Sequence, residues 1–139
     1  MATPSSVNAR LFYRAAKERF DDAEFLLNAG RTTAAVYLAG YGVECILKAL
    51  ILAQAPRARE KEILAEFKGA RAHQYDWLRE RYAEFGGPGL PREVALYFAH
   101  VEPWSTNIRY SPASVPLQEA KVFLNSVSEI FIWGDGRLS

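Results

Sequence analysis

The stretch from residue 34 to residue 52, AAVYLAGYGVECILKALIL, decides the fold, because it predicts a helix that is apolar on most of its sides. A helix of this kind is buried by its neighbours. Gly40 and Gly42 each weaken a helix by about 1 kcal/mol relative to Ala. Close packing against another helix or a second subunit would compensate. Small residues suited to such an approach form a seam: Ala35, Ala39, Gly42, Ile46, Ala49 and Ala53.

A separate stripe of the same helix carries polar groups on Tyr37, Tyr41, Glu44 and Lys48. Glu44 and Lys48 are four residues apart, in the order that favours an ion pair along a helix. Two readings remain open. The stripe is either a solvated or subunit-contact pair, or the polar floor of a cleft. The two charges argue against a membrane span over residues 34–55, because central charges are costly in a bilayer.

The rest of the chain also has helical spacing of its apolar residues and no alternation typical of strands. Gly30 is expected to end the first helix, and Thr32 or Thr33 to cap the second. Ser114 is expected to cap the last helix, with Pro116 in its first turn and Gly134 at its end. Helices are expected over residues 8–29, 32–54, 57–67, 75–85, 91–101 and 114–133. We predict an all-α, antiparallel, up-and-down bundle of four to five helices, forming one domain over residues 1–139 with flexible ends at 1–7 and 134–139.

Composition narrows the class of protein. Half of the 139 residues are hydrophobic, which is ample for one core, and 17 basic against 16 acidic residues give a net charge of +1. That balance gives no general case for wrapping nucleic acid. The single cysteine, Cys45, cannot form an internal disulfide and is expected to be a buried hydrophobe in a reducing, cytoplasmic setting. No phosphate-binding loop or metal-ligand spacing is present, so neither a cofactor nor a metal is expected.

Two further segments carry candidate binding residues. His73 precedes Asp76 at the start of a predicted helix, where a histidine is either a capping residue or a contact to phosphate or base. Arg109 and Tyr110 precede a Ser-Pro turn, and Arg109 could bind phosphate or carboxylate or pair with Glu44 in the core. Together with Tyr41, Glu44 and Lys48, these residues form a candidate ligand-binding cleft.

At these residues the sequence resembles the HEPN family, the higher-eukaryote and prokaryote nucleotide-binding domain. The Glu-x-x-x-Lys-Ala-Leu arrangement that begins at Glu44 is similar to the signature of the family's second helix. His73 with Asp76-Trp77-Leu78 resembles its His-Asp-Leu element, and Arg109 to Pro112 resembles its Arg-Tyr-Pro element. These three segments and the first helix, from Ala16, follow the family's order over most of the chain.

The resemblance implies a helical bundle that is commonly a homodimer, in prokaryotes often paired with a nucleotidyltransferase in toxin–antitoxin systems. Other members are metal-independent ribonucleases in which four to six residues separate an Arg from a following His. Here the residues at that distance before His73 are Glu66, Phe67 and Lys68, and those before His100 are Glu93, Val94 and Ala95. We therefore expect a non-catalytic module that binds a nucleotide, RNA or a nucleotidyltransferase. The alternatives are an atypical ribonuclease using His73 and a purely structural dimer or adaptor.

Overall fold

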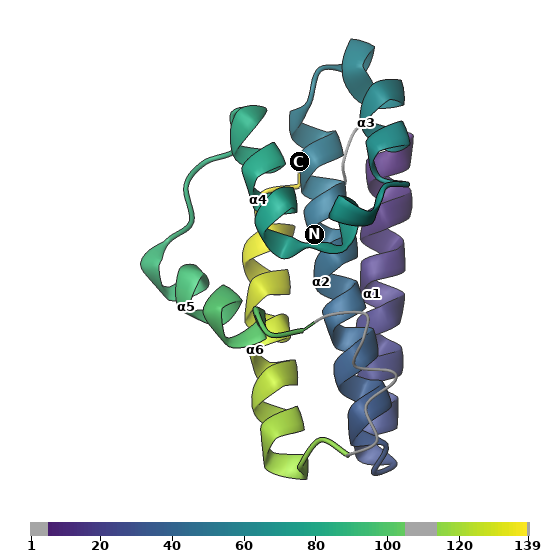
Figure 1. Cartoon of the computed structure of the whole chain (residues 1–139), viewed down its shortest axis with the longest axis vertical. Helices are drawn as coiled ribbons and strands as arrows, with labels where there is room; N and C mark the ends of the chain where they lie inside the picture. The colour runs from purple at the N-terminus through teal and green to yellow at the C-terminus, as the bar shows by residue number, and fades with distance from the viewer. Residues whose placement is uncertain (1–5, 105–113, 139) are drawn as a thin grey trace.

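The computed structural model describes residues 6–104 and 114–138, and these ranges contain helices and no strand, which confirms the all-α class. Three long helices run along the molecule (Figure 1): α1 (Val7–Asn28), α2 (Thr32–Gln54) and α6 (Leu117–Asp135). Three short helices follow α2 in the chain: α3 (Glu60–Glu66), on the right in Figure 1, and α4 (Tyr75–Glu84) and α5 (Arg92–Val101), on the left. Two 3₁₀ turns, Arg57–Arg59 and Ala70–His73, precede α3 and α4.

α1 and α2 form a close antiparallel hairpin because small side chains line their contact. Ala9, Ala16 and Ala23 recur every seven residues along α1, and all three are fully buried. On α2, a Cβ atom added to Gly42 would lie 3.3 Å from the carbonyl oxygen of Ala16 and 3.1 Å from the ring of Phe131. The small-residue seam of α2 is therefore used at least in part within the chain.

The turn between α1 and α2 ends the first helix as predicted, but its threonines have another role. Gly30 has a φ of 81°, the left-handed conformation that glycine accepts without strain. The Thr32 hydroxyl donates to the Val115 carbonyl at 2.6 Å, and the Val115 amide donates to the Thr33 hydroxyl at 3.1 Å. Neither threonine caps α2. Instead, both fasten the segment that leads into α6.

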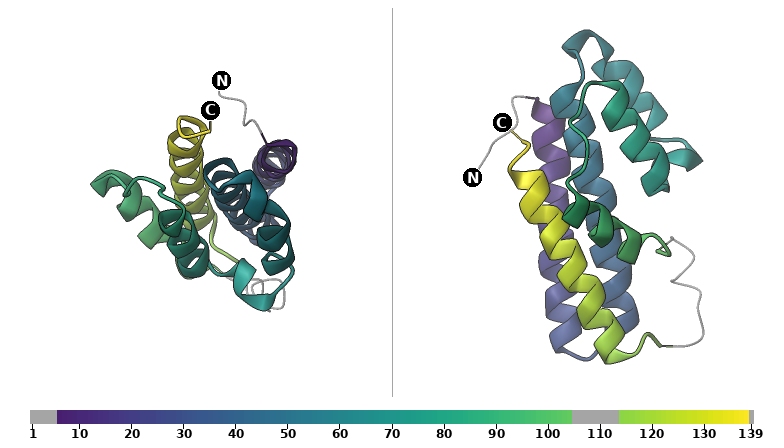
Figure 2. Two further views of the ribbon diagram at one scale, coloured as in Figure 1. Left: turned by 90° about the horizontal axis from the view of Figure 1, so that it is seen from above. Right: turned by 90° about the vertical axis from the view of Figure 1, so that its left-hand side faces the viewer.

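α6 packs against α2 and runs in the same direction as α2, while α1 runs opposite to both (Figures 1 and 2). The chain returns through α3, α4 and α5 before α6 begins, so the bundle is not a simple up-and-down arrangement. Gly134 allows the close approach, because a Cβ atom there would lie 3.0 Å from Ile46. The helix continues past Gly134 to Asp135, and Leu138 beyond it is fully buried. Residues 134–138, expected as a flexible end, thus include packed structure.

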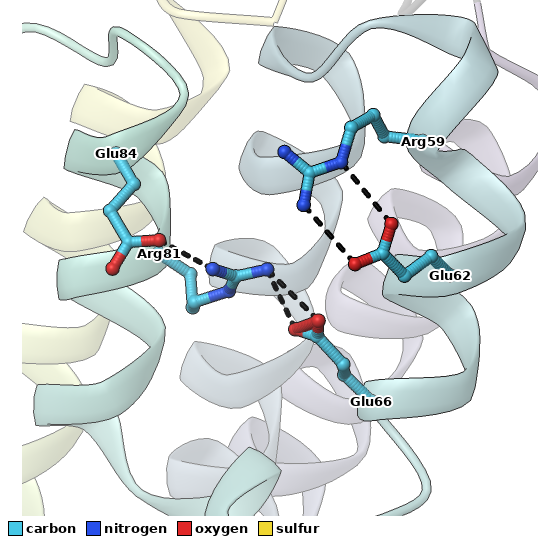
Figure 3. Close-up of polar contacts among 5 residues, drawn as sticks. All are labelled: Arg59, Glu62, Glu66, Arg81 and Glu84. Carbon is cyan, nitrogen blue, oxygen red and sulfur yellow. Dashed lines mark hydrogen bonds and ion pairs between the residues drawn. The ribbon is translucent and has the colours of Figure 1, made fainter.

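Two sets of charged side chains lie where α3 faces α4 (Figure 3). Arg81 on α4 pairs with Glu66 at 2.7 Å and also with Glu84, while Arg59 and Glu62 pair with each other at 3.2 Å. Only 16% of the Arg81 side chain is exposed, so its pairs are better shielded from solvent than the Arg59–Glu62 pair. Arg81 is therefore the main polar link between α3 and α4.

α2 is the core helix of the molecule. Its length would also suit a membrane-spanning helix, as would the mean hydropathy of 1.6 over its most apolar 18 residues. Of those 18 residues, however, 83% are buried by the rest of the protein. Burial by neighbouring helices is the environment that its sequence predicted. The candidate site lies on the polar stripe of this helix.

Candidate functional site

The centre of the candidate site is a buried ion pair on α2. The Nζ atom of Lys48 lies 2.8 Å from Oε2 of Glu44, as the four-residue spacing predicted. The Glu44 side chain is 1% exposed and the Lys48 side chain 7%. A buried charge requires a partner, because loss of hydration is expensive. The pair is therefore a core feature rather than a solvated stripe.

Aromatic rings complete the surroundings of Lys48. Its Nζ atom lies 5.9 Å from the ring centre of Phe12 and 5.4 Å from that of Phe67, which suits cation–π attraction. Phe12 and Phe67 also pack edge to face with centroids 5.6 Å apart. In this arrangement the ammonium group of Lys48 binds Glu44 and faces two rings. Its role in the candidate site is to hold Glu44 in place.

His73 links the second, buried oxygen of Glu44 to the protein surface. The last residue of the 3₁₀ turn Ala70–His73, it places Nδ1 3.0 Å from Oε1 of Glu44. With Glu44 as a carboxylate, the hydrogen sits on Nδ1, and Nε2 becomes the acceptor. The His73 side chain is 46% exposed, so the imidazole connects a buried carboxylate with solvent. This fixed ring can accept a proton or bind a ligand through Nε2.

Tyr75 and Trp104 form an aromatic wall beside His73. Their rings are stacked, with centroids 5.4 Å apart and planes 9° from parallel. The Tyr75 hydroxyl donates to the Gly40 carbonyl at 2.7 Å, and Trp104 Nε1 donates to the Tyr37 carbonyl at 3.2 Å. Trp104 also lies directly on Gly40, where a Cβ atom would be 2.2 Å from the indole. The missing side chain of Gly40 therefore leaves the room in which the Trp104 ring packs against α2.

Tyr75 and Trp104 line a pocket of about 190 Å³, together with two acidic side chains. Arg79 on α4 pairs with Asp76 and, at 3.3 Å, with Glu102. The hydrogen bond from Arg79 holds the pKa of Asp76 below its ordinary value. Burial, followed by a hydrogen bond with Asp76, raises the pKa of Glu102. The residues that line the pocket are His73, Gln74, Tyr75, Asp76, Glu102 and Trp104.

The other sequence candidates lie apart from the pocket or outside the described residues. Tyr41 is one helical turn from Glu44, and burial and then the charge of Glu44 raise the pKa of its hydroxyl. Cys45 is buried, as expected, and burial raises the pKa of its thiol to about 12. Arg109 and Tyr110 fall in the segment 105–113, which is outside the described residues.

Sequence reasoning placed Glu44, Lys48, His73 and Asp76 in one site, and the structure brings these four together in adjoining positions. Sequence reasoning missed Tyr75, Trp104 and the Arg79–Glu102 pair. The glycine at position 40 of a buried helix indicated only that some other group packs closely there. In residues 6–104 and 114–138, no group of three His, Cys, Asp or Glu side chains is placed to hold a metal ion.

Comparison with known protein families identifies the chain. The model of the HEPN domain matches residues 9–136, which is nearly the whole chain and includes every residue of the site described above. Neither the curated proteins nor the solved structures gave a match.

Proposed function

We propose that this chain, which belongs to the HEPN domain family, is a non-catalytic binding module that works as a homodimer and takes a nucleotide at the pocket beside His73. The observation that carries the proposal is the contact between His73 Nδ1 and the buried carboxylate of Glu44. A ring held at one nitrogen by a buried partner presents its other nitrogen in a fixed direction. A preorganised group of this kind binds with less loss of side-chain freedom.

The chemistry of the pocket suits the sugar or base of a nucleotide better than its phosphates. Carboxylates such as Asp76 and Glu102 accept hydrogen bonds from ribose hydroxyls or from base amino groups. They would repel a phosphate placed between them. A volume of about 190 Å³ fits one such part of the ligand. The phosphates would then lie outside the pocket, on the side of the exposed His73 imidazole.

The proposal is tested by titrating AMP, GMP, CMP and UMP into the purified protein in a calorimeter. We expect at least one of them to bind, and His73→Ala to weaken that binding by roughly tenfold, the worth of about one hydrogen bond to a charged group. His100→Ala is the matched control, because His100 contacts Ser126 at 3.2 Å and is not part of this pocket. Equal affinities for the wild-type protein and His73→Ala would exclude the assignment.

A protein ligand is the second part of the same proposal. We propose that this chain pairs with a nucleotidyltransferase, as in a toxin–antitoxin pair. Its nucleotide site would then face that enzyme. Co-expression with a nucleotidyltransferase encoded beside the gene, followed by purification through a tag on one chain, tests the pairing. Recovery of the tagged chain alone would remove the partner from the proposal and leave the nucleotide site to the calorimetric test.

A ribonuclease is the alternative that the His73–Glu44 contact favours, because a carboxylate-bound imidazole is a good proton acceptor. No Arg is separated from His73 by the four to six residues of the ribonuclease motif, so the motif's phosphorane-stabilising group is missing. We expect RNA to remain intact after incubation with the pure protein, alone and with its partner. Cleavage that is lost in His73→Ala and kept in His100→Ala would replace the binding proposal with a catalytic one.

A further inference from the structure

The outer face of α1 is not covered by any other described helix. α1 lies at the edge of the molecule, next to α2 (Figure 2). Ala9, Ala16 and Ala23 mark its buried side. At 100° per residue, the positions that point directly away from those alanines are 7, 11, 14, 18, 21 and 25. These six residues, which we call the α1 seam, are Val7, Leu11, Arg14, Glu18, Asp21 and Phe25, and all are exposed.

The α1 seam has the spacing of a helix-packing surface. Its members are alternately four and three residues apart, which is the heptad spacing that keeps one face of a helix toward a partner helix. Three of the six are large apolar side chains with high exposure: Val7 at 60%, Leu11 at 56% and Phe25 at 73%. The apolar residues lie toward the two ends of the helix, and charged residues lie between them.

The order of the charges identifies the partner. Val7 and Phe25 lie nine residues on either side of Ala16, and Arg14 and Glu18 lie two residues on either side of it. In an antiparallel pair of α1 helices centred at that position, Val7 of each copy faces Phe25 of the other. Arg14 of each copy faces Glu18 of the other. Leu11 of each copy then faces Asp21 of the other, so the complementarity of this two-fold contact lies in the Val7–Phe25 and Arg14–Glu18 pairs.

The flanking residues follow the same order. Exposed basic residues lie in the first half of α1 and exposed acidic residues in the second half, so antiparallel copies place opposite charges together. Within one chain, Arg19 pairs with Asp22 at 3.2 Å and with Glu18 at 3.7 Å. These pairs are on the surface, where ion pairs are weak and exchange readily. A parallel arrangement would instead place Arg14 against Arg14 and Glu18 against Glu18.

We infer that the α1 seam is the surface through which two copies of this chain associate, with their α1 helices antiparallel. The inference rests on the homodimer of the proposed function and specifies the face that forms it. The contact combines a few apolar side chains with ion pairs that remain near solvent. Association should consequently weaken as salt increases, because exposed charges are screened.

Charge reversal tests the contact by sedimentation velocity across a concentration series. We expect Arg14→Glu and Glu18→Arg each to weaken dimerisation by roughly tenfold or more, because each change replaces two attractive contacts with two repulsive ones. The two variants mixed together should form a heterodimer, because the acidic side chains of one chain then face the basic side chains of the other. The double variant R14E/E18R should regain the homodimer. Lys121→Glu on the exposed face of α6 is the matched control and should dimerise normally.

The outcomes separate this inference from the ligand proposal. A wild-type protein that is monomeric throughout, or a dimer unaffected by Arg14→Glu, would overturn the α1 seam. A dimer lost in Lys121→Glu and kept in Arg14→Glu would move the contact to α6. For the wild-type protein, the dimer should weaken between about 50 and 500 mM NaCl, and a dimer strengthened by salt would also overturn the inference. Nucleotide titration of Arg14→Glu measures the His73 site independently of dimerisation.

Discussion

Replacing Gly40 with alanine should destabilise the protein although it improves the intrinsic preference of α2 for a helix. The added Cβ would lie 2.2 to 2.3 Å from three atoms of the Trp104 indole, closer than any non-bonded contact allows. Trp104 is only 7% exposed and would have to leave its position. Loss of a buried tryptophan costs about 3–5 kcal/mol. The gain in helix propensity offsets about 1 kcal/mol of this.

We therefore expect Gly40→Ala to lower the free energy of unfolding by about 3 kcal/mol. The melting temperature should fall by roughly 10 °C for a domain of this size. The change in the free energy of unfolding is measured by urea titration with circular dichroism as the probe. Gly89→Ala is the control, because a Cβ atom there would meet nothing within 4 Å, and its effect should stay within about 0.5 kcal/mol.

A double-mutant cycle identifies the cause of the loss. In the background of Trp104→Ala the clash is absent, so adding Gly40→Ala should be harmless or stabilise by about 1 kcal/mol. The reasoning fails if Gly40→Ala alone is as stable as the wild-type protein, or if its cost is the same with and without Trp104. Either result would show that the indole does not rest on Gly40.

Three other changes have expected results. Glu44→Ala should lower the free energy of unfolding measured in urea by about 3–5 kcal/mol, because it leaves Lys48 buried and unpaired. Adding Lys48→Met should restore most of that free energy; if it restores none, lost packing rather than the unpaired charge causes the destabilisation. The Cys45 thiol should not react with Ellman's reagent at pH 8 in the folded protein and should react once urea unfolds it. Its pKa of about 12 leaves roughly one thiol in ten thousand ionised at that pH, so rapid labelling without urea would contradict the burial. Arg81→Ala should destabilise by roughly 1 kcal/mol, since the Arg81 side chain is itself largely shielded. Arg59→Ala, in a more exposed pair, should leave the melting temperature unchanged; equal effects of the two changes would show that shielding does not matter here.

The helices could be predicted closely from the sequence because the apolar residues of each keep helical spacing. α2 was predicted to end at Gln54 and does so, and the left-handed Gly30 ends α1. The direction of α6 could not be predicted, because it depends on how the short helices return the chain. The role of Thr32 and Thr33 also depends on that return, since both bind Val115.

The candidate site shows the same limit. The Glu44–Lys48 pair is local, and its four-residue spacing was sufficient to predict it. His73 became a candidate through its position at a helix start and through the family resemblance, and no spacing rule placed it beside Glu44. A glycine in a buried helix indicated that something approaches Gly40, but nothing local indicated Trp104, which follows it by more than sixty residues.

The parallel course of α2 and α6 has a consequence for how the chain folds. α1 and α2 are neighbours in sequence, so their hairpin closes a short loop and can form early. α6 is separated from α2 by more than sixty residues, and its docking closes a much longer loop. Until it docks, Ile46 and Leu50 lack the cover that α6 gives them near Gly134. A nascent chain that has emerged only as far as α5 therefore exposes an apolar surface on α2. How long the chain remains prone to aggregation depends on how quickly the last helix is synthesised.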